Sequence, residues 1–586
     1  MASSRFLRYL LGGAFLASAG WVQAEVKMSP LFGDHMVLQQ GMNLPVWGTA
    51  DAGEKVTVTV GTTTGTATTG ADGKWIVKLA PLKSGNTPMT MTVAGKNTLT
   101  FSDVLIGEVW VCSGQSNMEF GMTMRPKPQD EITAANVPLL RLFTTPKIPS
   151  LTPVSELTDA PKNPMQAHWV VCTPDTVAKA GTWGGFTAVG YFFGREIQKS
   201  TGGPVGLIES SWGGTPAQAW TPADALAKNP ALKIYSDGYA SAAAAADKNK
   251  ADYPAKKAEF DAAMAKWNQE VKPAFDKSMA DWKTDADQAK AAGQPIPPRP
   301  VASTPPPKPP ADPTGGPNTS TTLYNGMISP LIPYGIKGVI WYQGESNAGQ
   351  AELYRVLFPT MITAWRENWG EGDFPFLFVQ LAGFGGGGLW PVLRESQLKT
   401  LSLPKTGMAS AVDVGDPKNI HPGDKLDVGL RLALAAKHIA YGQNVVYSGP
   451  IYDKMKVEGN AIRISFTQVG GGLVIGAPPS YAPGLTPPPT DKLVGFVIAG
   501  ADKKFVPAEA KIEGNEVVVS SPEVPSPVAV RYAWEAVPPM NFYNKEGLPA
   551  SPFRTDDWQF IPPAAPMHAP PVVSAPVTTP APPATK

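Results

Sequence analysis

Four segments of the chain share one pattern, in which an apolar, strand-like run ends in glycine and polar residues. The runs lie at 104–111, 205–208, 338–342 and 408–412. Helical patterns separate or follow them at 186–200, 351–369 and 426–441. Parallel neighbours need a crossover of this kind, and strands that are buried on both faces are apolar throughout. The pattern therefore predicts an α/β fold, with a parallel sheet covered by helices on both faces.

Strand-like alternation with a period of two marks the regions on either side of this core. Residues 56–60 and 74–78 alternate before it, and residues 461–466 and 516–519 alternate after it. Turn residues separate the short runs, as is typical of antiparallel β-structure. We therefore predict a β-sandwich region at 25–103, an α/β domain at 104–445 and a second all-β region at 446–560.

Residues 225–320 interrupt the α/β order. Apolar side chains recur at steps of three and four from Phe260 to Trp282, which predicts an amphipathic helix that is bent or broken near Pro273. Residues 295–317 then contain eleven prolines in twenty-three positions, which favours an extended, semi-rigid segment. We interpret the block as an inserted arm whose apolar face docks on the main domain. The alternative is a rim of the active site or an oligomer contact.

The two ends of the chain have the composition of segments outside the fold. Arg5 and Arg8 precede an apolar stretch at 10–19 and a small residue, Ala24. This order predicts a secretory signal at 1–24, hence a periplasmic or secreted protein, in preference to an uncleaved anchor. The proline-rich residues 561–586 are predicted to be a disordered tail. After export, the only two cysteines, Cys112 and Cys172, would either pair or stay as separate buried thiols.

The charge balance and the residue counts exclude several classes of partner. The net charge of +1 provides no excess of cations for nucleic acid or for a membrane surface. No segment after the signal is long and apolar enough to span a bilayer. With two cysteines, no histidine pair at ligand spacing and no phosphate loop, we predict neither a metal nor a cofactor. The oligomeric state does not follow from the sequence.

The predicted strand ends carry residue types that suit acyl transfer. Ser116 follows a glycine-containing turn after the first strand, where its hydroxyl would be exposed at the carboxyl end of a parallel strand. A helix-capping serine is the alternative interpretation. Gly213 and Gly214 follow the second strand and leave backbone N–H groups free. Gln343 and Asn347 follow the third strand and offer side-chain donors, although loop capping would also explain them.

The fourth strand end supplies a candidate base. A serine hydroxyl needs a base that titrates near neutral pH, which is the role of an imidazole. The chain has five histidines, and His421 is the one that lies in a predicted strand-end loop. The other four lie in the β-region, away from the strand ends, in a helix and in the tail: His35, His168, His438 and His568.

Together these segments resemble the sialate O-acetylesterase-like carbohydrate esterases of the wider SGNH hydrolase superfamily. The matching stretches occur in the family's order at 114–118, 212–215, 343–347 and 420–422. The resemblance covers about residues 26–445 apart from the insertion, and it implies an SGNH-type doubly wound parallel sheet. Some relatives in this group are acetylesterases of plant polysaccharides such as xyloglucan, and do not act on sialic acid.

The resemblance implies removal of O-acetyl groups through a serine acetyl-enzyme. Ser116 would be the nucleophile and His421 the base. The oxyanion would be bound by the N–H groups of Ser116 and of Gly213 or Gly214, together with the side chain of Gln343.

The acid that would orient His421 stays open. The superfamily often has an aspartate three residues before the histidine, and Lys418 stands there in this chain. Asp416 is our first candidate and Glu345 our second. Asp413 or a backbone carbonyl near Asn419 are the remaining alternatives.

The predicted partner is an acetylated carbohydrate, either a plant cell-wall oligosaccharide such as xyloglucan or an O-acetylated sialic acid. Trp212, Asn347 and Trp390 are predicted to contact it, and we expect about two of the five loop tryptophans to do so, since most tryptophans belong to a core. These five are Trp183, Trp212, Trp220, Trp341 and Trp390. The alternative functions are a catalytically silent carbohydrate-binding protein, and a lipase or thioesterase of the same superfamily.

Overall fold

A seven-stranded path of a larger sheet lies at the centre of the molecule, in the order β13-β12-β11-β7-β10-β8-β9. The computed structural model describes residues 25–158, 165–292, 294, 297–479 and 491–560. Neighbours along the path are parallel except β8 and β9. The strands are β7 (Thr98–Gly114), β8 (Val137–Thr144), β9 (Val170–Cys172), β10 (Val205–Ser211), β11 (Gly338–Tyr342), β12 (Phe376–Gln380) and β13 (Thr406–Ser410). Mixed α/β architecture with a largely parallel central sheet is thus confirmed.

Helices cover both faces of this sheet. Trp110 of β7 packs against Phe193 of α4 (Ala188–Thr201), which itself packs against α10 (Lys425–Ile439). Trp341 of β11 packs against Phe358 of α8 (Ala351–Trp369). Trp341 is in register with Ser113, three residues from Trp110. Because side chains alternate along a strand, the two tryptophans and their helices lie on opposite faces.

The N-terminal β-structure is continuous with the central sheet through β7. The first half of this strand pairs with β6 (Gly85–Ala94), and β1 (Val37–Gln39) pairs with its middle. From Glu108 onward it pairs with β10 and β11. The predicted boundary at 103/104 therefore falls inside one strand. The remaining N-terminal strands are β2 (Leu44–Thr49), β3 (Lys55–Val60), β4 (Thr63–Thr68) and β5 (Lys74–Leu79).

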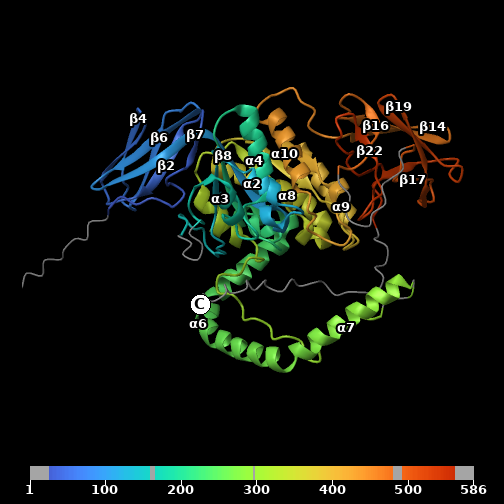
Figure 1. Cartoon of the computed structure of the whole chain (residues 1–586), viewed down its shortest axis with the longest axis horizontal. Coiled ribbons are helices and arrows are strands. Elements are labelled where there is room, and N and C mark those ends of the chain that lie inside the picture. Colours follow the sequence, from blue (N-terminus) through green and yellow to red (C-terminus); the bar gives the residue numbers. More distant parts are fainter. Residues whose placement is uncertain (1–24, 159–164, 293, 295–296, 480–490, 561–586) are drawn as a thin grey trace, which may run out of the picture.

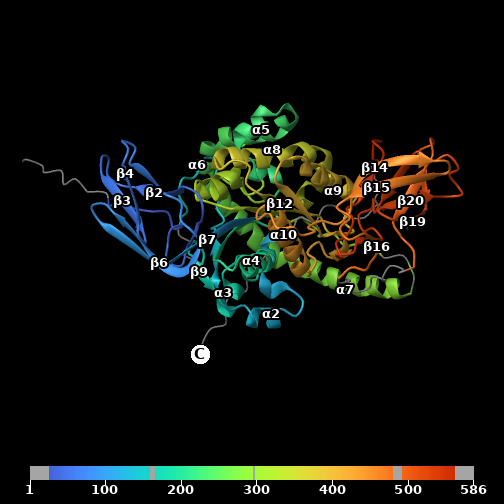
Figure 2. The same ribbon diagram turned by 90° about the horizontal axis from the view of Figure 1, so that it is seen from above.

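The C-terminal β-structure forms separate antiparallel sheets around a second hydrophobic core. It lies at the opposite end of the α/β part from the N-terminal strands (Figures 1 and 2). One four-stranded sheet contains β14 (Ile451–Glu458), β15 (Ala461–Thr467), β19 (Glu509–Glu513) and β20 (Glu516–Ser520). A second contains β17 (Phe496–Ala499), β18 (Phe505–Pro507), β21 (Ala529–Tyr532) and β23 (Phe553–Arg554), and β16 (Leu473–Ile475) pairs with β22 (Phe542–Asn544).

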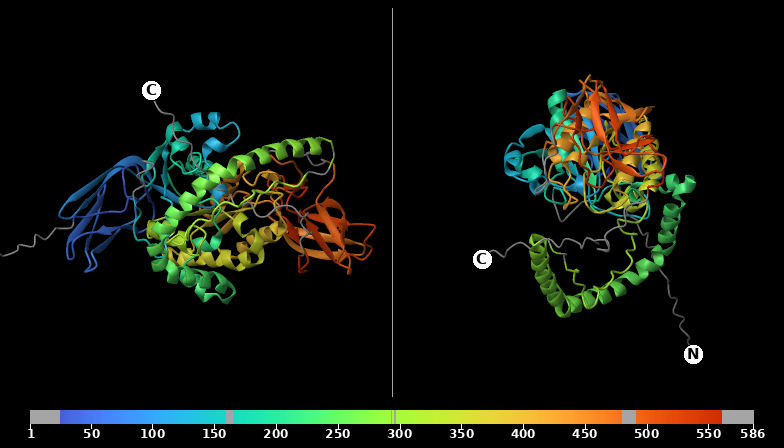
Figure 3. Two further views of the ribbon diagram at one scale, coloured as in Figure 1. Left: turned by 90° about the horizontal axis from the view of Figure 1, so that it is seen from below. Right: turned by 90° about the vertical axis from the view of Figure 1, so that its right-hand side faces the viewer.

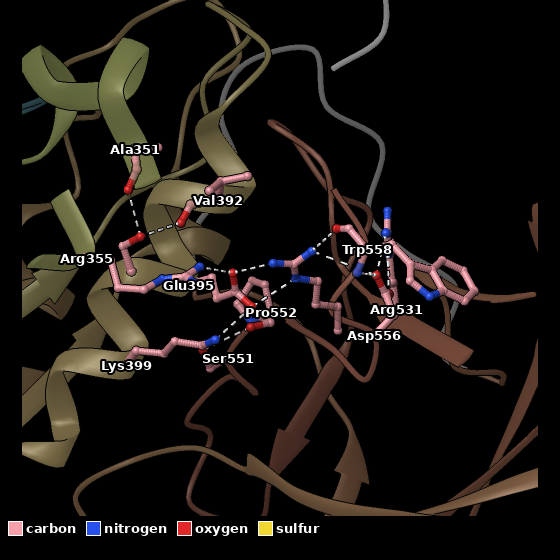
Figure 4. Close-up of polar contacts among 12 residues, drawn as sticks. Ala351, Arg355, Val392, Glu395, Lys399, Arg531, Ser551, Pro552, Asp556 and Trp558 are labelled. Atoms are coloured by element: carbon pink, nitrogen blue, oxygen red, sulfur yellow. Dashed lines mark hydrogen bonds and ion pairs between the residues drawn. The ribbon is translucent and has the colours of Figure 1, made fainter. Parts of the chain in front are cut away.

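Glu395 joins this C-terminal structure to the α/β part. It lies on α9 (Trp390–Lys399), and its carboxylate accepts bonds from Arg554 of β23 at 2.9 Å (Nε and Nη2) and from Arg355 of α8 at 2.5 Å (Figure 4). The side chains of Glu395 and Arg554 are each 9% exposed. The contact is therefore largely shielded from solvent, where a charge-assisted bidentate pair is strongest.

The inserted segment forms two helices, of which the first starts against the body at Tyr235, and both then extend away from it (Figures 1 and 3). They are α6 (Lys233–Glu270) and α7 (Lys272–Ala291), and Pro273 lies in the first turn of α7, where proline costs no hydrogen bond. The predicted break near Pro273 is thus confirmed.

We expected the apolar stripe of this arm, from Phe260 to Trp282, to dock on the main domain. The structure instead shows its two tryptophans bonded to another segment of the arm. Trp267 Nε1 and Trp282 Nε1 donate to the carbonyls of Thr304 and Pro297, each at 2.8 Å. Both acceptors belong to the proline-rich return. An extended proline-rich chain has no internal hydrogen bonds, so its carbonyls are free to accept from the indoles. The return therefore contacts the stripe at two of its tryptophans.

The two cysteines lie inside the described structure, whereas the two ends of the chain do not. Cys112 and Cys172 are free and buried, so they do not pair. The predicted signal at 1–24 and the predicted tail at 561–586 lie outside the described residues. Within the described ranges, no helix combines the length and the apolar character that a membrane crossing needs.

Candidate active site

The carboxyl end of the central sheet brings Ser116 to the start of a short helix. β7 ends at Gly114, and α1 begins with Ser116 (Ser116–Glu119). Gly114 has φ of +138°, and a Cβ there would lie 2.2 Å from the carbonyl oxygen of Tyr342, so only glycine fits this turn. The N-cap is Gln115, which makes no side-chain capping bond. The alternative in which Ser116 merely caps a helix is therefore wrong.

His421 faces this serine from the loop between β13 and α10. Its Nε2 atom lies 2.8 Å from Ser116 Oγ. The Trp183 ring and the imidazole pack in a T-shaped arrangement, with ring centroids 5.0 Å apart. Burial, together with the nearby Lys425 cation, lowers the pKa of His421 to about 4, while Glu119 opposes the shift. The imidazole is therefore neutral at pH 7 and able to accept a proton.

Asn117 connects three of the four sequence segments. Its Nδ2 group donates to Glu345 Oε1 at 2.6 Å and to the carbonyl of Ile420 at 2.9 Å. Its Oδ1 atom accepts from Lys425 Nζ at 2.5 Å. Asn117, which follows the candidate nucleophile Ser116, thus binds Ile420, which precedes the candidate base His421.

The predicted acid partners of His421 lie elsewhere. Asp416 Oδ1 accepts from the backbone of Lys418, and Glu345 is bound to Asn117. Asp413 is buried in a two-bond ion pair with Arg431. Within the described ranges, no hydrogen bond reaches His421 Nδ1. Asp416 and Glu345 are therefore corrected as orienting acids, because neither carboxylate makes a hydrogen bond to the imidazole in the described part of the chain.

The loop after β10 lies against Ser116. A Cβ at Gly213 would lie 3.2 Å from Ser116 Cβ, so a side chain there would press on the serine. The Gly213 N–H donates to Glu119 Oε2 at 2.6 Å. The buried Glu119 also accepts from Lys147 Nζ and Thr182 Oγ1, at 2.5 and 2.6 Å. Gly213 is thus next to the hydroxyl, but its N–H already has an acceptor.

Gln343 does not have a free donor for an oxyanion. It is fully buried, and its Nε2 group donates to Asn347 Oδ1 at 2.7 Å and to the Thr215 carbonyl at 3.3 Å. Its Oε1 atom accepts from Tyr354. An amide with both hydrogens engaged inside the protein ties two loops together, and the geometry does not support the predicted oxyanion role.

Two of the three predicted substrate contacts are buried. Asn347 is 1% exposed and bonded to Gln343, Gln218 and the Ala217 backbone. Trp390 is 4% exposed and donates to the Ala382 carbonyl. Trp212 is partly exposed. Of the five loop tryptophans only Trp183 and Trp212 keep exposed surface, since Trp220 and Trp341 are also buried.

Four residues of the site were missed by the sequence reasoning: Glu119, Lys147, Trp183 as a neighbour of the imidazole, and Lys425. Residue order shows neither the burial of Glu119 nor its pairing with Lys147, so these two residues carried no signal. Lys425 did carry one. It is the first residue of α10, where a cation opposes the helix dipole, and a lysine in that position calls for an explanation.

Comparisons with known proteins agree with this geometry. Residues 316–439 match a family model described as carbohydrate esterase, sialic acid-specific acetylesterase. The chain is 31% identical to a sialate O-acetylesterase of Rattus norvegicus over 72% of its own length and 75% of the relative's. It is 27% identical to that of Mus musculus over 89% and 92% of the two chains.

Among solved structures, a carbohydrate acetylesterase from Xanthomonas citri shares 34% identity with the chain. The superposition has a TM-score of 0.69 and covers 91% of this chain and all of that one. Similarity of this extent in both sequence and structure establishes more than a shared fold. The chain belongs to the sialate O-acetylesterase family of carbohydrate esterases and is a carboxylic-ester hydrolase that acts as a carbohydrate O-acetylesterase.

Proposed function

We propose that Ser116 is the nucleophile and His421 the general base of this acetylesterase. The observation that carries the proposal is the 2.8 Å contact between Ser116 Oγ and His421 Nε2. A neutral imidazole within hydrogen-bond reach of a hydroxyl is the arrangement that activates serine. The lowered pKa of His421, about 4, keeps the imidazole neutral over the physiological range.

The reaction proceeds in two steps. Ser116 Oγ attacks the acetyl carbonyl while His421 Nε2 takes the hydroxyl proton. The tetrahedral intermediate collapses, the C–O bond to the sugar breaks, and the imidazolium returns its proton to the departing sugar oxygen. Water then attacks the acetyl-enzyme with His421 again as base. Acetate leaves, and Ser116 regains its proton.

The oxyanion donors in this proposal are the backbone N–H groups of Ser116 and Gly214. Ser116 is the first residue of α1, so its N–H has no acceptor within the helix. Gly214 has φ of +77°, and a Cβ there would meet nothing within 4 Å. Its backbone thus borders open space next to Gly213, which touches Ser116. The end of a helix and a glycine turn together favour developing negative charge.

For the substrate, we propose an acetylated neutral oligosaccharide such as a xyloglucan fragment, with an O-acetylated sialic acid as the alternative. A sialic acid would need a cation for its carboxylate. Lys147 lies over the Trp212 ring but is bonded to Glu119, and Lys425 is buried. The partly exposed surfaces of Trp183 and Trp212 instead suit the apolar face of a sugar ring.

Acetate release from two substrates tests this function. The protein is incubated with acetylated xyloglucan oligosaccharides and, in parallel, with an O-acetylated sialic acid. Ser116→Ala is the inactive variant. Ser113→Ala is the matched control, because Ser113 lies in the same segment but donates to the Ser210 carbonyl, away from His421.

We expect release from the oligosaccharide, loss of release with Ser116→Ala, and retention with Ser113→Ala. Release from sialic acid alone would overturn the substrate proposal. A folded protein that is silent on both substrates would instead favour the carbohydrate-binding alternative. A preference for long acyl chains would favour the lipase or thioesterase alternative.

Export remains part of the proposal. Removal of residues 1–24 predicts a mature N-terminus at Glu25, which N-terminal sequencing of the natively produced protein would detect.

A further inference from the structure

We infer that Lys425 is a positioning residue of this esterase, which acts through the Asn117 amide to hold His421 against Ser116. The inference rests on the proposed roles of Ser116 and His421 and adds a residue to them. Lys425 itself does not touch Ser116 Oγ or the imidazole through any hydrogen bond in the described part of the chain. Its effect on the reaction is therefore indirect.

The ammonium group of Lys425 is enclosed on all sides. The residue is 0% exposed, and Nζ donates to Asn117 Oδ1 at 2.5 Å. The rings of Phe120 and Tyr342 lie next to it, with ring centroids at 4.7 and 5.3 Å from Nζ. Such ring faces are attractive to a cation. Burial lowers the pKa of Lys425 to about 7, although the nearby Glu345 carboxylate opposes the shift.

This contact fixes the orientation of the Asn117 amide. An ammonium can only donate, so it selects the carbonyl end of the amide. The NH₂ end then faces two acceptors, Glu345 Oε1 and the carbonyl of Ile420. With the amide reversed, the NH₂ group would oppose the ammonium and the oxygen would oppose the carboxylate. The position of the Ile420 carbonyl therefore depends on Lys425.

That carbonyl matters because little else holds the base. The His421 backbone N–H donates to Asn419 Oδ1 at 3.0 Å, and the ring packs against Trp183. In the described ranges, Nδ1 of the imidazole has no carboxylate partner. A serine hydrolase usually orients its histidine through that nitrogen. Here two backbone contacts do this work: Asn419 accepts the His421 N–H, and Asn117 binds the carbonyl of the preceding residue, Ile420.

The position of Lys425 is unfavourable for stability alone. A buried cation costs desolvation free energy, and the first residue of a helix is where the dipole repels a cation. Lys437, near the other end of the same helix, contrasts with it. That lysine lies in the last turn, where the dipole favours it, and pairs with Glu196. A role in the site accounts for the placement of Lys425.

The charges around the His421 imidazole and the Lys425 ammonium affect the pKa of His421, and hence the pH profile of the enzyme. A change in packing alone would not shift that profile. Lys425 of α10 and Glu119 of α1 act on His421, the first lowering its pKa and the second raising it. Glu345, beside β11, and Asp424, the N-cap of α10, both raise the pKa of Lys425. Removal of the Lys425 charge should therefore raise the pKa of His421.

The experiment compares Lys425→Met with Lys437→Met. Methionine keeps the length of the side chain and removes the charge in both. Steady-state kinetics with an aryl acetate are measured from pH 3 to 8, and folding is checked by circular dichroism. For Lys425→Met we expect kcat about 10²-fold lower from misplacement of the base, an unchanged KM, and an acid limb of the profile displaced to higher pH. Lys437→Met should keep both kcat and the limb.

A double variant keeps the test interpretable if the single one folds poorly. Lys425→Met with Glu345→Gln removes the opposite charge as well, so that no isolated carboxylate is left in the core. The same low kcat and displaced limb are expected. Wild-type kcat with an unmoved limb in the folded variant would overturn the inference, as would a loss of activity that only follows the loss of folded protein. Turnover by Ser116→Ala would instead contradict the proposed function, so the two failures are distinguishable.

Discussion

The Nε2 atom of His421 lies 2.8 Å from Oγ of Ser116, although 305 positions separate the two residues in the chain. Parallel strands produce this proximity, because the loops after β7 and β13 both emerge at the carboxyl edge of one sheet. The pair is further linked through Asn117, which binds the backbone carbonyl of Ile420. The parallel sheet thus brings Ser116 and His421 together, and the Asn117 amide links the two loops that carry them.

The pH dependence of kcat/KM should reflect the buried imidazole. His421 is active as a base only when neutral, and its lowered pKa of about 4 keeps it neutral above that value. We expect kcat/KM to be flat from about pH 5 to 7 and to fall below pH 4. Initial rates with an aryl acetate in overlapping buffers measure this. A midpoint near 6.5, the usual pKa of histidine, would contradict the burial of the ring.

Removal of Asp416 should have little effect. Its carboxylate accepts from the Lys418 backbone and not from His421. We expect Asp416→Ala to keep kcat within about tenfold of wild type, far from the ~10⁴-fold loss that follows from disabling a triad aspartate. Asn419→Ala should cost more, because Asn419 Oδ1 accepts the His421 N–H. If Asp416→Ala proved the more damaging of the two, Asp416 would be the acid partner after all.

The sequence predicted β7, β10, β11 and β13, because each of these apolar strands is followed by its own helix or loop signal, but it did not predict β8 and β9. Predicted and observed ranges coincide for β11 and α8, and differ by a few residues for β13. It also selected Ser116 and His421, which the structure brings into contact, since few histidines compete for the proposed role of base. Residue order did not show which side-chain hydrogen-bond donors would remain without a partner inside the folded protein. Gln343 and Asn347 look like oxyanion or substrate groups in one dimension, but they bond to each other in the folded protein.

The contacts of the inserted arm are a second feature that the sequence did not predict. Periodicity predicted the apolar stripe and its break near Pro273, but periodicity does not say what covers a stripe. The segment that contacts this stripe, at Trp267 and Trp282, is the proline-rich return. The domain boundaries of the chain remain predictions, and the passage of β7 from one β-region into the central sheet shows how a single strand can serve two regions.

Glu119 should be needed for both stability and turnover. Its carboxylate, on a side chain that is 5% exposed, binds Lys147 and the Gly213 N–H. Glu119→Ala leaves these donors without an acceptor, so we expect the free energy of unfolding to fall by about 3 kcal/mol and kcat to drop as the Gly213 loop shifts. Chemical denaturation and initial rates test this. Glu131→Ala removes a more exposed pair with Arg195 and should cost at most about 1 kcal/mol. Equal losses for the two variants would count against the role of Glu119.

Glu395 should hold the C-terminal β-structure without affecting the chemistry. It binds Arg554 in a largely shielded contact and also binds the partly exposed Arg355. We expect Glu395→Ala to lower the free energy of unfolding by about 3 kcal/mol, speed proteolysis after residue 446 and leave kcat near wild type. Lys399→Ala is the control, since that side chain is 52% exposed and its pair should contribute little. Unchanged proteolysis would show that other contacts carry this junction.

The most direct test of the account is covalent labelling of the nucleophile. The folded protein is treated with an aryl dialkyl phosphate, which reacts with activated serines, and the modified peptide is mapped by mass spectrometry. We predict a single adduct on Ser116, loss of acetate release in proportion to labelling, and no adduct in His421→Ala. Full inactivation with the adduct on another residue, or labelling of Ser116 at the same rate without His421, would contradict the pairing of these two residues.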